Sequence, residues 1–105
     1  MPDVIDLHSR NPLLGTWKTT DGFSDWQYTV SASAGKILVT GVDVEDGEKA
    51  EVNDVHWDEE KGVLSFSAYI TSTGRTLKFR VRQAPAQGRA MVTYTYTAQE
   101  TWELV

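Results

Sequence analysis

Short segments in which apolar and polar residues alternate follow one another along most of this chain of 105 residues. In one of them Trp26, Tyr28 and Val30 alternate with polar residues, which is the period of two that a half-buried β-strand shows. Turns of a few residues, most of them containing glycine, separate the segments. The pattern predicts eight strands: Thr16–Thr20, Asp25–Ala32, Lys36–Val44, Lys49–Trp57, Val63–Thr71, Arg75–Gln83, Arg89–Thr97 and Glu100–Val105.

The fourth segment changes phase in its middle. In a regular strand Ala50 and Val52 would share one face, whereas Val55 and Trp57 would share the other. A β-bulge near Asn53-Asp54 would bring all four side chains to the interior face, because a bulge adds one unpaired residue to its strand. The phase change therefore predicts a bulge.

The connections between segments are too short for helical crossovers, so neighbouring strands are expected to pair antiparallel as a meander. Eight strands with one apolar face each form either a closed barrel or two packed sheets. The unbroken meander favours closure, which leaves no exposed edge. The predicted fold is all-β: a single eight-stranded antiparallel up-and-down barrel over residues 11–105, after an N-terminal arm at residues 1–10. Asn11-Pro12 predicts a short helical turn through Leu14 that plugs one end.

Composition narrows the classes of partner. The formal net charge of −5 argues against nucleic acid and against an anionic membrane surface, because both require clustered basic side chains. Apolar runs long enough to span a membrane are absent, and the first residues do not form a signal peptide. Without cysteine there are no disulfides and no thiolate chemistry. These features predict a cytoplasmic protein, of bacterial type.

The opening of the strand region resembles that of a known superfamily. Asn11, followed by Gly15-Thr16-Trp17 directly before an eight-strand meander, is similar to the first-strand signature of lipocalins and the wider calycin group. The resemblance covers one motif and the meander, and it implies a fold more than an activity. Within that superfamily the chain looks most like small lipocalin-like bacterial β-barrel domains, an uncharacterised branch. The resemblance implies that Trp17 is the floor of the barrel, at the closed end.

Interior aromatic side chains are the first candidate site. They would line a cavity for an apolar or aromatic small molecule, held at the open end opposite Trp17. The predicted ligand-binding residues are Trp26, Tyr28, Trp57, Phe66, Phe79, Tyr94 and Tyr96. The alternative is that these rings, with Trp102, fill the barrel, whose interior is only just wide enough for side chains or one small ligand.

A filled barrel would make the protein a non-enzymatic structural or interaction domain. A homodimer would then form through Val63, Tyr69 and Met91 on the outer face. A second alternative is an isomerase or lyase of barrel fold, as some lipocalin-fold enzymes are. Its chemistry would draw on four residues that this sequence offers: Tyr28, Tyr94, Arg80 and Glu100.

The remaining polar clusters predict no catalytic residue, no metal site and no cofactor. His56 has acidic neighbours, but it faces solvent if Trp57 faces inward, and the only other histidine is His8. The acidic residues between Asp43 and Glu48 lack the ligand spacing of a calcium loop and are interpreted as a solvated turn. The basic row on the sixth segment is expected to face outward, although a one-residue change of register would turn Arg80 inward.

Overall fold

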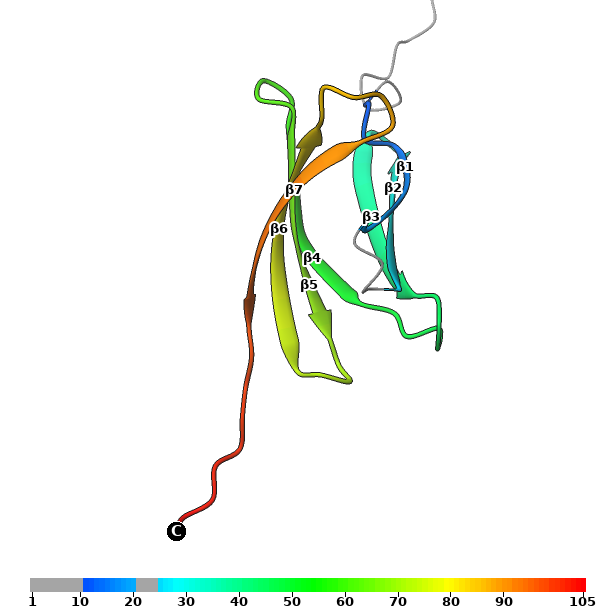
Figure 1. The fold of residues 1–105 in the computed structure, drawn as a ribbon. Coiled ribbons are helices and arrows are strands. Elements are labelled where there is room, and N and C mark those ends of the chain that lie inside the picture. The colour runs from blue at the N-terminus through cyan, green and yellow to red at the C-terminus, as the bar shows by residue number, and fades with distance from the viewer. Residues whose placement is uncertain (1–10, 21–24) are drawn as a thin grey trace, which may run out of the picture.

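Seven β-strands in two antiparallel sheets form the body of the protein in a computed structural model, which describes residues 11–20 and 25–105 (Figure 1). The strands are β1 (Gly15–Lys18), β2 (Trp26–Ser33), β3 (Lys36–Asp43), β4 (Glu51–Asp58), β5 (Val63–Ile70), β6 (Arg75–Gln83) and β7 (Ala90–Thr97). One sheet has the order β1-β2-β3 and the other the order β4-β5-β6-β7. The all-β class and the antiparallel pairing of successive strands within each sheet are confirmed. The predicted arm at residues 1–10 lies outside the described residues.

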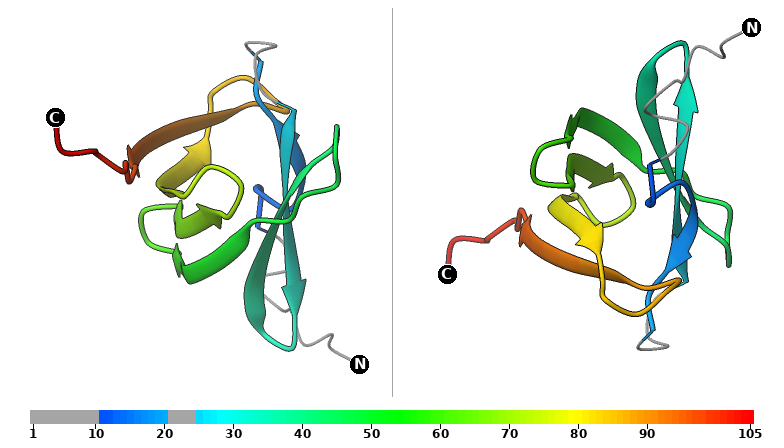
Figure 2. Two further views of the ribbon diagram at one scale, coloured as in Figure 1. Left: turned by 90° about the horizontal axis from the view of Figure 1, so that it is seen from below. Right: turned by 90° about the horizontal axis from the view of Figure 1, so that it is seen from above.

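The predicted closed barrel of eight strands is wrong. Among the described strands, β1 and β7 are outer strands of different sheets, and no pairing joins them. The two sheets connect where β3 passes into β4: Val42 pairs with Lys49, and the Ala50 N–H donates to the Gly41 carbonyl over 2.9 Å. The open side lies opposite this corner (Figure 2). The structure is therefore a pair of open sheets that face each other.

The missing eighth strand explains why the barrel stays open. Glu100–Val105, predicted as a strand, is instead extended chain that leaves the body after β7 (Figures 1 and 2). The segment from Ala98 onward contains no Gly, Pro, Asn, Asp or Ser, which are the residues that favour tight turns. The chain accordingly does not reverse beside β7. Trp102, expected to fill the barrel, is consequently 86% exposed.

The predicted helical turn at Asn11-Pro12 is also wrong, because the described residues contain no helix. A single turn stands there: the Leu14 N–H donates to the Asn11 carbonyl over 3.1 Å, and Asn11 Oδ1 accepts from the Leu13 N–H over 2.9 Å. Gly15, with φ +133°, begins β1 immediately afterwards and leaves no room for a helix. The side chain of Leu13 plugs that end of the structure in place of the expected helical turn, and it is completely buried.

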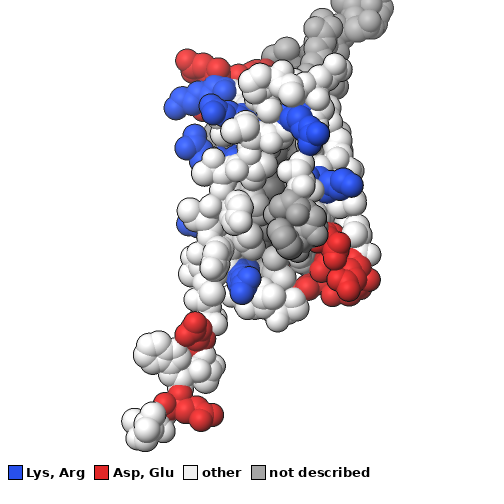
Figure 3. Space-filling view, viewed as in Figure 1, with Lys and Arg blue, Asp and Glu red and all other residues white. Residues whose placement is uncertain are grey.

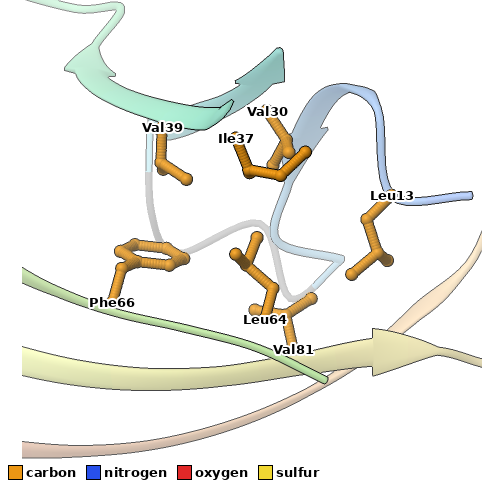
Figure 4. Close-up of a cluster of buried hydrophobic side chains, with 7 residues drawn as sticks. All are labelled: Leu13, Val30, Ile37, Val39, Leu64, Phe66 and Val81. Atoms are coloured by element: carbon orange, nitrogen blue, oxygen red, sulfur yellow. The ribbon is translucent and has the colours of Figure 1, made fainter. Parts of the chain in front are cut away.

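The core lies between the two sheets and is filled with side chains from both of them (Figure 4). Strand β5 contributes most clearly, since every second residue from Leu64 to Ile70 is buried. This alternation places one face of β5 against the opposite sheet. The buried apolar cluster consists of Leu13, Val30, Ile37, Val39, Leu64, Phe66 and Val81.

The predicted β-bulge is confirmed. The pairing of β4 with β5 shifts register between Asn53 and His56, and Asp54 has a φ of +56°. The extra residue restores the phase of the strand, as a bulge does. The apolar side chains on both sides of the bulge therefore face the core together: Val52, Val55 and Trp57 pack against it.

Candidate functional site

A solvent-open cleft of about 320 Å³ lies between the sheets, at the end where β3 leaves its sheet and β5 turns into β6. This end is opposite the one that Leu13 plugs, since Leu13 packs with Leu64 at the beginning of β5. The cleft is lined by the aromatic residues Trp26, Tyr94 and Tyr96, the apolar residues Ile70 and Leu77, and the polar or charged residues Asp43, Asp46, Glu48, Ser72, Thr73 and Arg75.

Aromatic rings connect the two walls of the cleft through the interior. On the β2 side the centroid of Trp26 lies 6.3 Å from that of Tyr28, and Tyr28 lies 5.1 Å from Phe79. Phe79 then lies 5.9 Å from Tyr94 on β7 and 4.9 Å from Phe66 on β5. Each distance is within the range of favourable ring contacts. The cleft is therefore the accessible end of a continuous aromatic cluster.

Tyr28 holds the centre of this cluster because of the residue opposite it. Its cross-strand partner is Gly41, and a Cβ built on Gly41 would lie 2.6 Å from Cε1 of the ring. Only glycine therefore lets the ring lie flat against β3 and reach Phe66 and Phe79. Burial raises the pKa of the Tyr28 hydroxyl to about 12, since ionisation is disfavoured away from water.

Polar contacts fix the rim of the cleft. The Glu48 carboxylate accepts two hydrogen bonds from Ser72, one from its backbone N–H over 2.9 Å and one from its hydroxyl over 2.6 Å. These bonds tie the loop between β3 and β4 to the hairpin between β5 and β6. On the other side the guanidinium carbon of Arg75 lies 5.5 Å from the centre of the Tyr96 ring, which is a cation–π contact.

Acidic side chains gather beside the cleft, at the loop between β3 and β4 (Figure 3). Carboxylate oxygens of Asp25, Asp43 and Glu45 all lie within 4.8 Å of one another. A hydrogen bond with Asp25, followed by the charges of Asp25 and Asp43, raises the pKa of Glu45. Such a set could hold a hard cation, but exposed carboxylates also gather without one, so the cluster alone does not define a metal site.

Sequence reasoning missed this cluster, because it interpreted the loop residues as a solvated turn and did not connect them with Asp25. The three acids meet only through strand pairing, in which Trp26, the residue after Asp25, lies opposite Asp43. The expected hairpin of the second and third segments contained the signal. In such a hairpin the first residue of the second segment, Asp25, lies beside the last residue of the third segment, Val44, and so close to the acidic loop that follows.

The structure divides the predicted ligand-binding residues into three groups. Trp26, Tyr94 and Tyr96 line the cleft. Tyr28, Phe66 and Phe79 lie deeper and belong to the core or pack against it. Trp57 pairs with Leu64 at the plugged end and contributes nothing to the cleft. Trp17, the expected floor, packs against the core from beside Tyr28, and its ring N–H donates to the Leu13 carbonyl over 2.7 Å.

The other candidate residues are not brought together. Arg80 is exposed and pairs with Thr93, on the face of the sheet opposite to that of Tyr94. Glu100 lies beyond β7 and accepts a hydrogen bond from the Trp102 ring N–H over 2.8 Å. The four residues of the isomerase or lyase alternative therefore do not share a site. His56 is exposed, and His8 lies outside the described residues.

Of the three residues expected at a dimer contact, Met91 is exposed, whereas Val63 and Tyr69 are half-buried.

The described residues contain no helix that is long and apolar enough to cross a membrane.

Comparison of the chain with protein-family models, with curated proteins and with solved structures found no match in any of the three. The lipocalin resemblance therefore stays a prediction that rests on Asn11 and Gly15-Thr16-Trp17. The closed barrel that it implied is not the observed fold.

Proposed function

We propose that this protein is a small-molecule binding module that holds an aromatic or apolar ligand in the cleft between Trp26 and Tyr94. The observation that carries the proposal is the chain of ring contacts from Trp26 through Tyr28 and Phe79 to Tyr94, which ends in solvent on both walls. Rings held by such contacts are fixed before a ligand arrives, so little side-chain freedom is lost on binding.

The size and charge of the cleft limit the ligand. A volume of about 320 Å³ is near the lower end for ligand pockets and suits one or two fused rings. Among the described residues, three carboxylates line it, from Asp43, Asp46 and Glu48, against the guanidinium of Arg75, which already lies over Tyr96. The charge balance favours a ligand with an amine or another hydrogen-bond donor over one with a carboxylate.

Three probes that share the indole ring system but differ in charge test the proposal. Indole, tryptamine and indole-3-acetate would be titrated into labelled protein while amide chemical shifts are followed. The expected result is saturable shifts at residues 43–48 and 70–75, with tryptamine binding most tightly and indole-3-acetate least tightly. The absence of saturable shifts with all three probes would overturn the proposal.

Two tyrosines on opposite faces of the same sheet provide a matched pair of variants. Tyr96 lines the cleft, while Tyr69 lies near the same end of the sheet on its outer face. Tyr96→Ala should weaken tryptamine binding by about five- to tenfold, since it removes one of the two rings that β7 contributes to the cleft. Tyr69→Ala should leave the affinity unchanged. Equal losses in both variants would place the binding elsewhere.

The interaction-domain alternative draws support from a different observation. The interior beyond the cleft is filled, with Leu64 completely buried between the sheets, while β7 presents its whole outer edge to solvent. A protein of this kind would act through its surface, and its partner would cover β7. Measuring self-association of the purified chain separates this candidate from a purely ligand-binding role.

A further inference from the structure

Strand β7 is an unusually open sheet edge. It is the outer strand of its sheet, and the residues from Met91 to Thr97 are all exposed. None of these seven residues is charged or a proline, and they are mostly β-branched or aromatic. Natural proteins usually protect such an edge with charges, proline or a covering segment, because its free N–H and C=O groups pair readily with another strand. The edge is therefore suited to receive a strand.

The chain's own next segment does not cover this edge. Each of the five connections from β2 to β7 contains a glycine with positive φ: Gly35, Gly47, Gly62, Gly74 and Gly88. After Gly88 there is no further glycine, and the described residues from Arg89 to Val105 include none with positive φ. The chain therefore runs straight on from β7 and leaves its body (Figure 1).

The segment at residues 98–105, here called the tail, has the pattern of a strand without a sheet. Trp102 is 86% exposed and Leu104 is fully exposed, and they alternate with polar Thr101 and Glu103. The Trp102 ring N–H reaches the Glu100 carboxylate, as residues two apart on one face of an extended chain do. Large apolar side chains in this pattern are typical of a strand with one buried face.

We propose that two copies of this chain exchange tails, so that the tail of each copy pairs antiparallel with β7 of the other as an eighth strand. A two-fold axis at Ala98 makes this pairing reciprocal, as a symmetric dimer requires. In that register Trp102 of the second copy lies opposite Tyr94, and Leu104 of the second copy lies opposite Val92. Tyr94 and Val92 share the inner face of β7, opposite Phe79 and Val81 of β6.

The same register brings each acidic residue of the tail near a basic one. Glu100 of the second copy lies opposite Tyr96, whose ring already contacts the Arg75 guanidinium. Glu103 of the second copy lies opposite Thr93, the cross-strand neighbour of Arg80. Opposite charges in neighbouring cross-strand positions stabilise a pairing and help to set its register. Association through this edge requires no ligand in the cleft.

Disulfide trapping tests the register and separates exchange between copies from folding back within one copy. The chain contains no cysteine, so introduced thiols are the only ones present. The double variant T93C/E103C places two thiols on the outer face, opposite each other in the proposed pairing. Mild oxidation should give a covalent dimer on a non-reducing gel. A cross-linked monomer, or no cross-link, would overturn the proposal.

Two further variants serve as controls. T93C/E100C places its thiols on opposite faces of the same pairing and should cross-link poorly; equal cross-linking of both double variants would overturn the register. In sedimentation equilibrium the unmodified chain should have about twice the 11.7 kDa of one copy. W102A/L104A should weaken the dimer by at least about tenfold without unfolding the body, because both side chains are exposed, while T101A should not. A monomeric unmodified chain at high concentration would also overturn the proposal.

Discussion

The ring of Tyr28 lies against the backbone of Gly41, so close that no other residue fits at position 41 without moving the ring. A Cβ there would meet Cε1 at 2.6 Å and Cδ1 at 2.8 Å, distances that side-chain carbons do not tolerate. The same ring contacts Phe66 and Phe79 from the opposite sheet. One glycine on β3 therefore determines how the two sheets meet beside the cleft.

Gly41→Ala should cost about 1–3 kcal/mol of the free energy of unfolding, because the added methyl displaces a packed ring. The displaced ring should also leave Phe79, and ring-current shifts of Phe79 protons would report this. Thr40→Ala, on the exposed face of the same strand, should change the free energy of unfolding by less than about 0.5 kcal/mol. Urea denaturation of both variants measures the difference, and equal effects would contradict the role assigned to Gly41.

The raised pKa of Tyr28 predicts a loss of stability in alkaline solution. Burial raises this pKa from 10.0 to about 12, so between these values the hydroxyl ionises in the unfolded chain but not in the folded protein. The unfolded state then binds fewer protons, and the contribution of Tyr28 to stability, complete below pH 10, falls as the pH rises toward 12. Between pH 9 and pH 11 the unmodified chain should lose more free energy of unfolding than Tyr28→Phe. Identical losses in the two proteins would contradict this.

The bulge at Asp54 predicts an unusual tolerance to deletion. Because two residues there oppose one residue of β5, removing Asp54 leaves Val52, Val55 and Trp57 on the interior face of a regular strand. The protein lacking Asp54 should fold with little change in stability. Deleting His56 instead turns Trp57 outward, and should cost more than about 3 kcal/mol. Denaturation midpoints of the two deletion variants test this, and similar destabilisation by both would argue against the bulge.

The two hydrogen bonds between Glu48 and Ser72 are expected to stabilise the rim of the cleft, where they join the loop between β3 and β4 to the hairpin between β5 and β6. Ser72→Ala removes the hydroxyl that donates to Glu48 over 2.6 Å, and Glu48→Ala removes both hydrogen bonds. Ser72→Ala should cost about 1 kcal/mol or less, as exposed hydrogen bonds do, and Glu48→Ala somewhat more. Amide exchange at Ser72 should accelerate most in Glu48→Ala. Unchanged exchange in that variant would show that the loop and the hairpin are held in another way.

The strands and the bulge could be predicted from the sequence because a period of two records which face of a strand is buried. The phase change between Val52 and Val55 is itself such a record, and the structure confirms it. Whether the strands close into a barrel could not be predicted in this way. Alternation shows that a segment has an apolar face, but it does not show which neighbouring strand that segment pairs with. Trp102 and Leu104 alternate as a buried strand would, yet both are exposed. The lack of turn residues after Thr97 was the signal that distinguishes the two cases.

The candidate site was predictable to the same extent. Trp26, Tyr94 and Tyr96 follow from the inward face of their strands, and they line the cleft. Trp57 has the same inward orientation but lies at the other end of its strand, and the period of two carries no information about position along a strand. Asp25 comes close to Asp43 and Glu45 only because β2 pairs with β3 in one particular register. Predicting the acidic group therefore requires the register of the pairing as well as the positions of the strands.

The two sheets are joined along one corner, where β3 continues into β4 through the Val42–Lys49 bridge and the bond from Ala50 to Gly41. Among the described strands, this corner is where backbone pairing holds the two sheets together. At the end around Leu64 the sheets are also held by buried side chains, whereas at the other end the space between them opens as the cleft. The bonds between Glu48 and Ser72 add a second tie at the rim of the cleft, between the loop that follows β3 and the hairpin between β5 and β6.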